Sequence, residues 1–333
     1  MRKVACLFTL LVSVVVCLLP AHAAQRDRVF VASYGSDSNP CTFGSPCKTF
    51  QNAVSVVAPG GEVTAIDSAG FGPVNISQSV TITSPAGVEA GIAATADYAI
   101  YIDAPGATVK LRGLTLDGAN AASYGIRFLA GARLEVVNCT VSDFNAAGIS
   151  VATETTTSVL ISHTIVNDNN PTNNPNDYGI GVSLNPGAGG SITAALDHVT
   201  LSNNGLGLSA TVSDPATASM ETLITDSHID NNIYAGMIIA GTTYSSGGAY
   251  ISSAILKNVT LNDDGAGDGG LAIFALDYSS IWLSKVTQTS VTGFPATSIY
   301  FFPLGTDISV YSDGSNHLMG STLDGSTMPW PPN

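Results

Sequence analysis

Three histidines stand at comparable places along the chain and are the first candidates for chemistry. Imidazole is the commonest metal ligand among side chains. When the chain is aligned on its polar turns, His163 and His198 share one position, whereas His228 falls one position away. In a stack of strands, two such residues lie about 4.8 Å apart, with no third ligand beside them. We therefore expect His163 and His198 to be structural neighbours in one bend and to bind no metal.

Acidic and amide side chains gather in turns, and one turn is dense enough to suggest a cation. Asp263, Asp264 and Asp268 fall within seven residues and offer the hard oxygen ligands that Ca²⁺ prefers. The alternative is that Asn, Asp and Gly occur there because they accept left-handed turn conformations. No cofactor is otherwise indicated, so calcium at these three aspartates is the metal prediction. The adjacent Asp263 and Asp264 also raise glycoside hydrolysis, which uses two carboxylates at a set separation.

Aromatic and cationic side chains form a second candidate site, for binding. Tyr98, Tyr124 and Tyr178 each directly precede a small residue, and Tyr101 and Arg127 follow three positions after the first two. Tyrosine combines a flat apolar face with a polar tip, so such residues form a strip on which sugar rings stack. The alternative is that the aromatics only shield exposed strands and that Arg127 is a solvated side chain. These five residues are the predicted ligand-binding set.

The elements that must position these residues are short strands in a repeat. A small residue followed by apolar-x-apolar recurs at intervals of 26, 23, 31, 26, 31, 34 and 28 residues. The copies lie at 99–102, 125–128, 148–151, 179–182, 205–208, 236–239, 270–273 and 298–301. A fixed order of short strands at a drifting period of this size is typical of a solenoid.

The variable residue inside each copy is expected to face solvent, because alternate residues of a strand point to opposite sides. In the first five copies these residues are Tyr101, Arg127, Ser150, Gly181 and Gly207. Large side chains come first and small ones follow, which predicts a trough where an extended ligand lies close to the backbone. Any contact with a glycan is predicted on this face.

Charge and the start of the chain limit partners and location. The 333 residues carry a formal net charge of −14, which argues against nucleic acid because phosphate binding needs a basic face. Arg2 and Lys3 precede an apolar run, and Ala21-His22-Ala23 resembles a cleavage site, so residues 1–24 are predicted to be a signal peptide. The run is short for a membrane span. The expectation is a secreted protein, extracellular or periplasmic, with no membrane span.

Removal of that leader would leave three cysteines, Cys41, Cys47 and Cys139. Export favours oxidation. Cys41 and Cys47 flank a tight Thr-Phe-Gly-Ser-Pro loop, so a disulfide between them is expected, the alternative being two free surface thiols. Cys139 aligns with Leu114 and Val199 of other copies and is expected to be a buried small apolar residue.

The segment from Val31 to Val54 contains a Gly-x-Asp-x-Asn-Pro turn followed by Pro-x-Lys-Thr and an alanine. It resembles the opening of secreted right-handed parallel β-helix proteins of the pectate-lyase-like superfamily, which have the pectin lyase fold. Two positions that usually hold glycine and an aromatic residue are here Cys41 and Cys47, which fits a covalent replacement. Residues 49–57 show helical apolar spacing and are expected to cap the end of the solenoid, with Pro59-Gly60-Gly61 ending the helix.

The resemblance implies an all-β fold: a single right-handed parallel β-helix, or solenoid, with a short N-terminal capping helix. The expected organisation is a signal peptide (1–24), an N-terminal strand with disulfide loop and capping helix (25–60), the β-helix (61–325), and a tail (326–333) too rich in proline to form a strand. One polar column is also implied to correspond to the asparagine ladder of this superfamily: Gly113, Asn138, His163, His198, Asp226, Asn258 and Lys285.

Activity is less clearly implied than fold. Polygalacturonases of this superfamily carry Asn-Thr-Asp, Asp-Asp, Gly-His-Gly and Arg-Ile-Lys signatures, and only Asp263-Asp264 is present here. Its lyases use Lys or Arg with calcium, and Arg127 is the best-placed cation. The prediction is therefore a protein that binds, or is displayed on, polysaccharide or a cell-surface glycan without a complete catalytic motif. The alternative is a polysaccharide-degrading enzyme, either a uronate lyase or a glycoside hydrolase.

Overall fold

The structure is a computed structural model. It describes residues 26–169, 179–212, 218–241, 252–262, 271–276, 279–284, 287–290, 297–302, 309–312, 315–316 and 327–329. The predicted signal peptide, Tyr178 and the aspartates Asp263, Asp264 and Asp268 lie outside these residues, so the expectations placed on them stay predictions.

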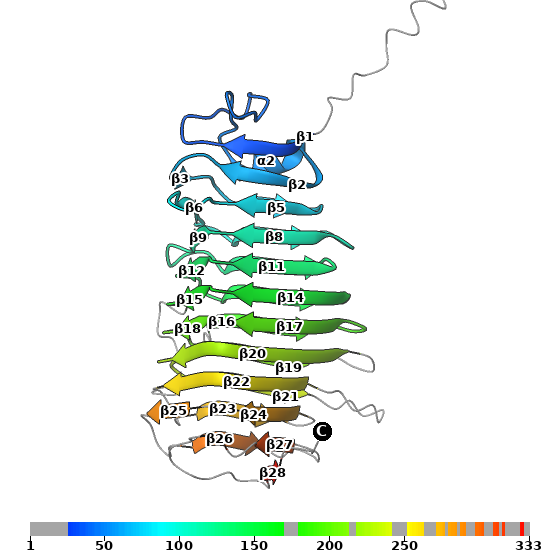
Figure 1. Ribbon diagram of the computed structural model, residues 1–333, viewed down its shortest axis with the longest axis vertical. Coiled ribbons are helices and arrows are strands. Elements are labelled where there is room, and N and C mark those ends of the chain that lie inside the picture. Colours follow the sequence, from blue (N-terminus) through cyan, green and yellow to red (C-terminus); the bar gives the residue numbers. More distant parts are fainter. Residues whose placement is uncertain are drawn as a thin grey trace, which may run out of the picture.

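The described chain winds into a three-sided stack of parallel strands (Figure 1). Two sides belong to one sheet and are called the long face and the short face; the third face is a separate sheet. The long face contains β1 (Arg26–Val31), β2 (Val57–Ala65), β5 (Val80–Thr83), β8 (Thr108–Arg112), β11 (Arg133–Val137), β14 (Thr156–Ser162), β17 (Ser191–Asp197), β24 (Ser279–Ser284), β27 (Ser309–Ser312) and β28 (Thr327–Pro329). The short face contains β3 (Ala69–Gly70), β6 (Ala90–Ala93), β9 (Leu114–Asp117), β12 (Thr140–Ser142), β15 (Ile165–Asn167), β18 (Thr200–Ser202) and β25 (Thr287–Ser290).

Two long strands, β20 (Ser219–Asp230) and β22 (Ser252–Asn262), run through both the long and the short face. The third face contains β4 (Val74–Ile76), β7 (Tyr98–Asp103), β10 (Tyr124–Ala130), β13 (Ala147–Thr153), β16 (Ile180–Pro186), β19 (Leu206–Val212), β21 (Ala235–Gly241), β23 (Leu271–Leu276) and β26 (Thr297–Phe302). This architecture is the parallel β-helix expected from the sequence.

Register is kept from coil to coil, so inward residues form continuous apolar columns. One column of the long face has no exposed member: Ile82, Leu111, Val136, Ile161, Leu196, Ile224 and Leu256. Each side chain packs against the same position of the coils above and below. Burial of apolar surface, worth about 25 cal/mol per Å², is therefore spread evenly along the axis.

The bend between the long and short faces is made by one residue per coil in the left-handed conformation. Its described members are Gly113, Asn138, His163, His198, Asp226 and Asn258, with φ between 49° and 69°. These belong to the polar column predicted from the sequence. The five side chains of this column are exposed, however, so it is not a buried asparagine ladder. The expected neighbours are confirmed: the rings of His163 and His198 stack 4.8 Å apart and 3° from parallel.

A buried asparagine ladder does exist, at the bend between the short and third faces. Asn169, Asn204 and Asn232 have no exposed surface. The Asn169 Nδ2 donates to Asn204 Oδ1 at 2.8 Å, and Asn204 Nδ2 donates to Asn232 Oδ1 at 3.1 Å. Each Oδ1 also accepts the backbone N–H of the preceding coil, beginning at Phe144. The sequence prediction assigned the ladder to the wrong bend, because both bends are rich in asparagine.

Glycines stack directly beside this ladder. A Cβ on Gly181 would lie 2.6 Å from the Gly207 carbonyl oxygen and 2.9 Å from Asn204 Nδ2, and Gly148 and Gly207 are confined in the same way. Ile149 pairs with Val182, which in turn pairs with Leu208. The repeat in these coils therefore starts at Gly181 and Gly207, two residues later than the sequence prediction.

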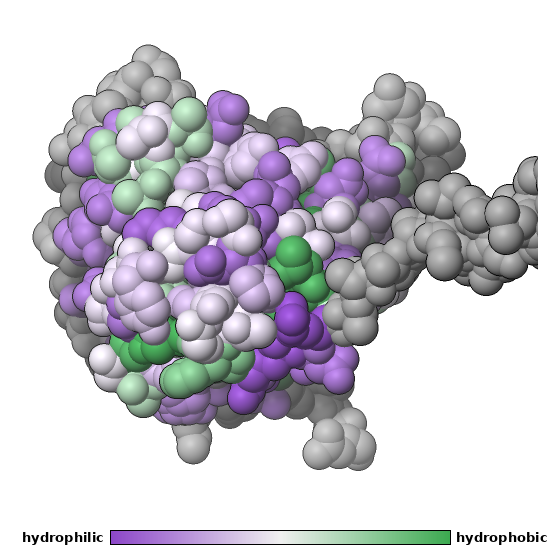
Figure 2. All heavy atoms as spheres, turned by 90° about the horizontal axis from the view of Figure 1, so that it is seen from above, coloured by the Kyte–Doolittle hydropathy of each residue, from purple (hydrophilic) through white to green (hydrophobic). Residues whose placement is uncertain are grey.

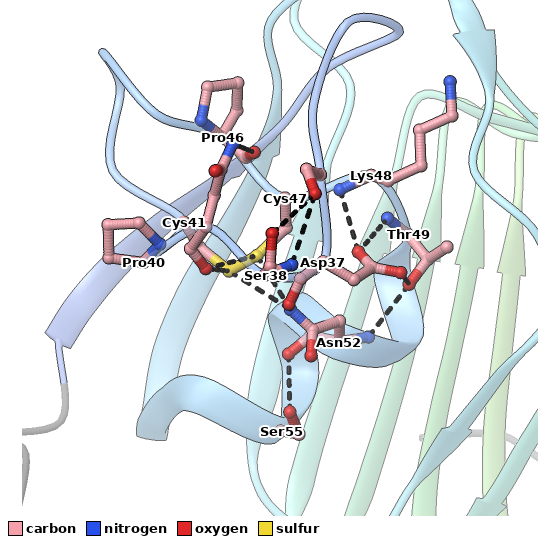
Figure 3. Close-up of a disulfide and its surroundings, with 12 residues drawn as sticks. Asp37, Ser38, Pro40, Cys41, Pro46, Cys47, Lys48, Thr49, Asn52 and Ser55 are labelled. Atoms are coloured by element: carbon pink, nitrogen blue, oxygen red, sulfur yellow. Dashed lines mark hydrogen bonds between the residues drawn. A yellow bond between two sulfur atoms is a disulfide. The ribbon is translucent and has the colours of Figure 1, made fainter.

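The N-terminal end is closed by helix α2 (Phe50–Val56), which lies under the loop that follows β1 (Figure 1). Thr49 is its N-cap and accepts the Asn52 N–H at 3.1 Å. The Asp37 carboxylate accepts the N–H groups of Lys48 and Thr49, both at 2.9 Å (Figure 3). Seen along the axis, the described surface of this end is mostly hydrophilic, with separate apolar patches (Figure 2). The cap thus covers the apolar interior.

The Cys41–Cys47 disulfide is confirmed and lies against this helix (Figure 3). Both cysteines are fully buried, and Asn52 Nδ2 lies 3.0 Å from the Cys47 Sγ and 3.1 Å from the Asp37 carbonyl oxygen. The loop, the disulfide and the helix therefore form one hydrogen-bonded unit.

Two expected ends were placed wrongly. Pro59-Gly60-Gly61 does not separate the helix from the first long strand, because β2 already begins at Val57 and contains all three residues. The tail is not wholly irregular either, since Thr327–Pro329 form β28 beside β27. Proline is tolerated at position 59 because residues 58–61 bulge out of the pairing between β1 and β2. It is tolerated at position 329 because, among the described strands, β28 pairs only with β27.

Candidate functional site

Four of the five residues predicted to bind a ligand come together on the third face: Tyr98, Tyr101, Tyr124 and Arg127. Two successive inward residues, Ala99 and Ile100, follow Tyr98, so Tyr98 and Tyr101 both face outward from β7. In β10, Tyr124 is likewise followed by two successive inward residues, Gly125 and Ile126, and therefore faces outward. This happens because the coil turns its corner at that position and the small residue fills the inside of the turn.

The next strand, β10, repeats the arrangement in register. Tyr124 pairs with Tyr98, and Arg127 pairs with Tyr101. The Tyr98 and Tyr101 rings lie 4.9 Å apart at 33°, and the Arg127 guanidinium carbon lies 4.6 Å above the Tyr124 ring. The four side chains form one patch across two strands, here called the tyrosine patch.

The guanidinium of Arg127 is held in place on the patch. Its Nη1 donates to Ser150 Oγ at 2.6 Å, from the strand of the following coil, β13. A guanidinium stacked on tyrosine gains about 0.5–2 kcal/mol from the ring quadrupole. Arg127 is thus a half-buried, oriented hydrogen-bond donor and not a solvated side chain.

The outward positions beyond Ser150 are held by other residues than expected. Ser150 pairs with Ser183, Ser183 with Ser209, and Ser209 with Ile238. Gly181 and Gly207 do not occupy the outward positions, because the strand begins two residues later than predicted. A shift of two residues keeps the same side chains inside, so apolar alternation could not reveal it. The tyrosine patch is instead followed by a row of serines.

A second group of chemically active side chains lies on the bend column, and the sequence prediction missed it. Asp197, His198 and Asp226 offer ligand atoms that all lie within 4.8 Å of one another. The Asp197 carboxylate lies 3.1 Å from His198 Nδ1. The hydrogen bond from Thr225, followed by that from His198 and its charge, outweighs desolvation and lowers the pKa of Asp197. The signal in the sequence was the acidic residue preceding the histidine, together with an aspartate at the same column position one coil later.

A third group pairs charges on the long face. Glu135 is 8% exposed and accepts a hydrogen bond from Arg133 Nε at 2.7 Å. Arg112 and Lys110 also approach its Oε2, at 3.4 and 3.7 Å. Burial alone would raise the pKa of Glu135, but the Arg133 hydrogen bond and the neighbouring positive charges lower it overall.

Cys139 is confirmed as a buried residue, 3% exposed. Burial raises the pKa of its thiol to about 11. Because the thiolate is the reactive form, this cysteine is unsuited to act as a nucleophile near neutral pH.

No family profile and no curated protein matches the chain in sequence. Solved structures do match it. Pectate lyase Pel9A superposes with a TM-score of 0.55 at 11% identity, over 89% of this chain and 78% of that one. The chain shares the parallel β-helix fold of this pectate lyase. Full-length tailspike protein 2 of Escherichia coli O157:H7 bacteriophage CAB120 gives 0.53 at 12% identity, over 87% of this chain but 42% of its own.

At such identities this pectin-lyase-type fold is shared without any implication of a shared activity. The chain spans less than half of the tailspike protein. Within the described residues no helix is long and apolar enough to cross a membrane. The disulfide is compatible with the predicted export, since such bonds persist in oxidising compartments.

Proposed function

We propose that this protein is a secreted, non-catalytic β-helix that binds polysaccharide through the tyrosine patch. The observation that carries the proposal is the register of β7 and β10, which places Tyr98, Tyr101, Tyr124 and Arg127 in one patch. Tyrosine faces stack against sugar rings, and an oriented guanidinium donates to hydroxyl or carboxylate oxygens.

The fold supports this choice of ligand. Pectate lyase Pel9A, the neighbour with a TM-score of 0.55, is a pectate lyase by name. Parallel β-helices present long open faces on which extended chains can lie, which suits a polymer better than a small molecule enclosed in a pocket. Affinity on an open surface of this kind is expected to be weak, in the millimolar to micromolar range.

The test begins with a panel of plant and bacterial polysaccharides in affinity gels, with and without Ca²⁺. Against a polysaccharide that retards the parent protein, Tyr124→Ala and Arg127→Ala are expected to lower the association constant about 3- to 10-fold each, corresponding to the loss of one stacking contact. Tyr34→Ala and Arg26→Ala serve as matched controls, because both residues are exposed on the N-terminal cap. Equal retention of the two patch variants and the parent would remove the patch from the proposal.

The enzyme alternative is tested in the same samples. A lyase would release unsaturated uronates and a hydrolase new reducing ends, whereas a binding protein releases neither. Its candidate carboxylates, Asp263 and Asp264, lie outside the described residues. Substituting both by asparagine should leave binding unchanged if the patch alone carries it, and should abolish product release if the protein is a hydrolase.

A further inference from the structure

We propose that Asp197, His198 and Asp226 form a binding site for a divalent transition-metal ion that joins two successive coils of the solenoid. This site lies on the bend column between the long and short faces and is independent of the proposed glycan binding. The sequence prediction of no metal here rested on two imidazoles with no third ligand. The structure supplies the missing ligands as carboxylates, from the residue before His198 and from the next coil.

The spacing suits one ion. Two ligand atoms about 2.1 Å from the same ion, at angles near 90–110°, lie about 3.0–3.4 Å apart. Asp197 Oδ2 and His198 Nδ1 are 3.1 Å apart. All three ligand atoms lie within 4.8 Å, so a small rotation of the exposed Asp226 side chain completes the set. Asp197 pairs in register with Thr225, which places His198 and Asp226 one coil apart on the same column.

The ligands are also oriented by neighbours that do not bind the ion. Thr225 Oγ1 donates to Asp197 Oδ1 at 2.6 Å, and Asn258 Nδ2 donates to Asp226 Oδ1 at 2.5 Å. Each bond fixes one oxygen of a carboxylate, and the hydrogen bond to Asp197 leaves Oδ2 directed at the histidine. The His163 ring stacks on the other side of His198 and restrains its plane. Such outer partners commonly raise metal affinity by orienting the ligands.

Charge and ligand type identify the class of ion. Two carboxylates and a neutral imidazole carry a charge of −2, which a divalent cation neutralises. An imidazole nitrogen favours Zn²⁺, Ni²⁺ or Cu²⁺ over Ca²⁺, which prefers an all-oxygen site with six or more ligands. Lys257, in register with Thr225, is the nearest cation on the adjoining strand and is exposed. With three protein ligands and solvent access, coordination would be completed by water.

The experiment measures Zn²⁺ binding to the tag-free exported protein by competition with a chromophoric chelator, together with the thermal midpoint. One Zn²⁺ per chain at micromolar affinity is expected, with a rise in the midpoint because the ion joins two coils. His198→Asn and Asp226→Asn should each weaken binding at least 10-fold. Both variants should fold, since asparagine occupies the same column at Asn138 and Asn258.

His163→Asn is the matched control, because it removes the stacked imidazole from the same column without removing a ligand. It should change Zn²⁺ affinity less than 3-fold. The proposal is overturned if no saturable site exists below millimolar Zn²⁺, or if His163→Asn loses as much affinity as His198→Asn. It is equally overturned if Ca²⁺ at the same concentration displaces the bound Zn²⁺, since that would mean a general attraction of cations to an acidic surface.

Discussion

Glu135 is a single carboxylate that holds three cations on the surface of a strongly acidic chain. Arg133 contacts it along the same strand, and Lys110 and Arg112 approach from the previous coil. The three cations are 36–48% exposed, whereas the Glu135 side chain is 10% exposed. Removing a cation should therefore cost little, because solvent screens it, but removing the carboxylate leaves three positive charges close together.

Glu135→Gln is accordingly expected to destabilise the protein by about 1.5–3 kcal/mol at pH 7, the range for hydrogen bonds to charged groups. The folded-state pKa of Glu135 lies below its ordinary value of 4.5. Its pairing is therefore fully present above pH 4.5 and is lost as the pH falls through the folded-state pKa. Chemical denaturation at pH 7 and pH 3 measures both effects, and the difference in stability between the parent and the variant should be smaller at the lower pH.

The exposed Glu221→Gln is the control for loss of one carboxylate and should change stability by less than about 0.5 kcal/mol at pH 7. An equal loss in both variants would show that the ion group around Glu135 contributes nothing specific.

Some of these residues could be found from sequence and others could not. Tyr98, Tyr101, Tyr124 and Arg127 were found because each stands at a fixed distance from a small residue, and in-register stacking then brings them together. The Asp197–His198–Asp226 group was missed because only residues of one type were compared down a column. Chemistry in a solenoid is assembled between adjacent columns as well as within one.

At the scale of one turn, the asparagine ladder shows the same limit. In each of three coils the turn holds a residue with positive φ, then a buried asparagine: Asp168 and Asn169, Asn203 and Asn204, Asn231 and Asn232. Where two asparagines are adjacent, composition cannot tell which one faces inward. The spacing could: each buried asparagine follows the last buried strand residue, Val166, Leu201 or Ile229, by three positions. Aligning the coils on that residue would have identified the ladder.

Asn204→Ala tests the ladder at its centre. Asn204 Oδ1 accepts both the N–H and the Nδ2 of Asn169, and its own Nδ2 donates to the Val166 carbonyl. Alanine leaves three buried groups without these partners, at about 1–3 kcal/mol each, so a loss of at least about 3 kcal/mol is expected in chemical denaturation. The neighbouring Asn203→Gly preserves the positive φ and should cost less than 1 kcal/mol. Comparable losses would contradict a stabilising ladder.

The repeat boundaries show why strand positions were easier to predict than strand starts. Inward and outward residues alternate with a period of two, so a copy beginning at Gly179 or at Gly181 buries the same set of side chains. What selects Gly181 is the carbonyl of Gly207, which leaves no room for a Cβ. That constraint comes from the next coil and cannot be seen within one copy. The identity of the outward residues depended on this choice.

At the scale of the whole molecule, each coil contacts mainly its two neighbours, so stability is expected to be local along the axis. The N-terminal coil has a neighbour on one side only, and the cap takes the place of the other. The cap is held by the Asp37 bonds to Lys48 and Thr49, by helix α2 and by the disulfide. Destabilising the cap should increase local unfolding of the first coils and leave the stability of distant coils unchanged.

The double variant Cys41→Ala/Cys47→Ala tests this locality. A disulfide closing so short a loop contributes about 2 kcal/mol by restricting the unfolded chain. Hydrogen exchange with mass spectrometry should show faster exchange in β1, α2 and β2, and unchanged exchange in β14 and β17, because stability is transmitted only between adjacent coils. Cys139→Ala removes a buried free thiol between β11 and β12. It should instead speed exchange around its own bend and leave the cap protected. Uniform acceleration along the chain in the double variant would mean that the solenoid unfolds as one cooperative unit and that the cap stabilises all of it.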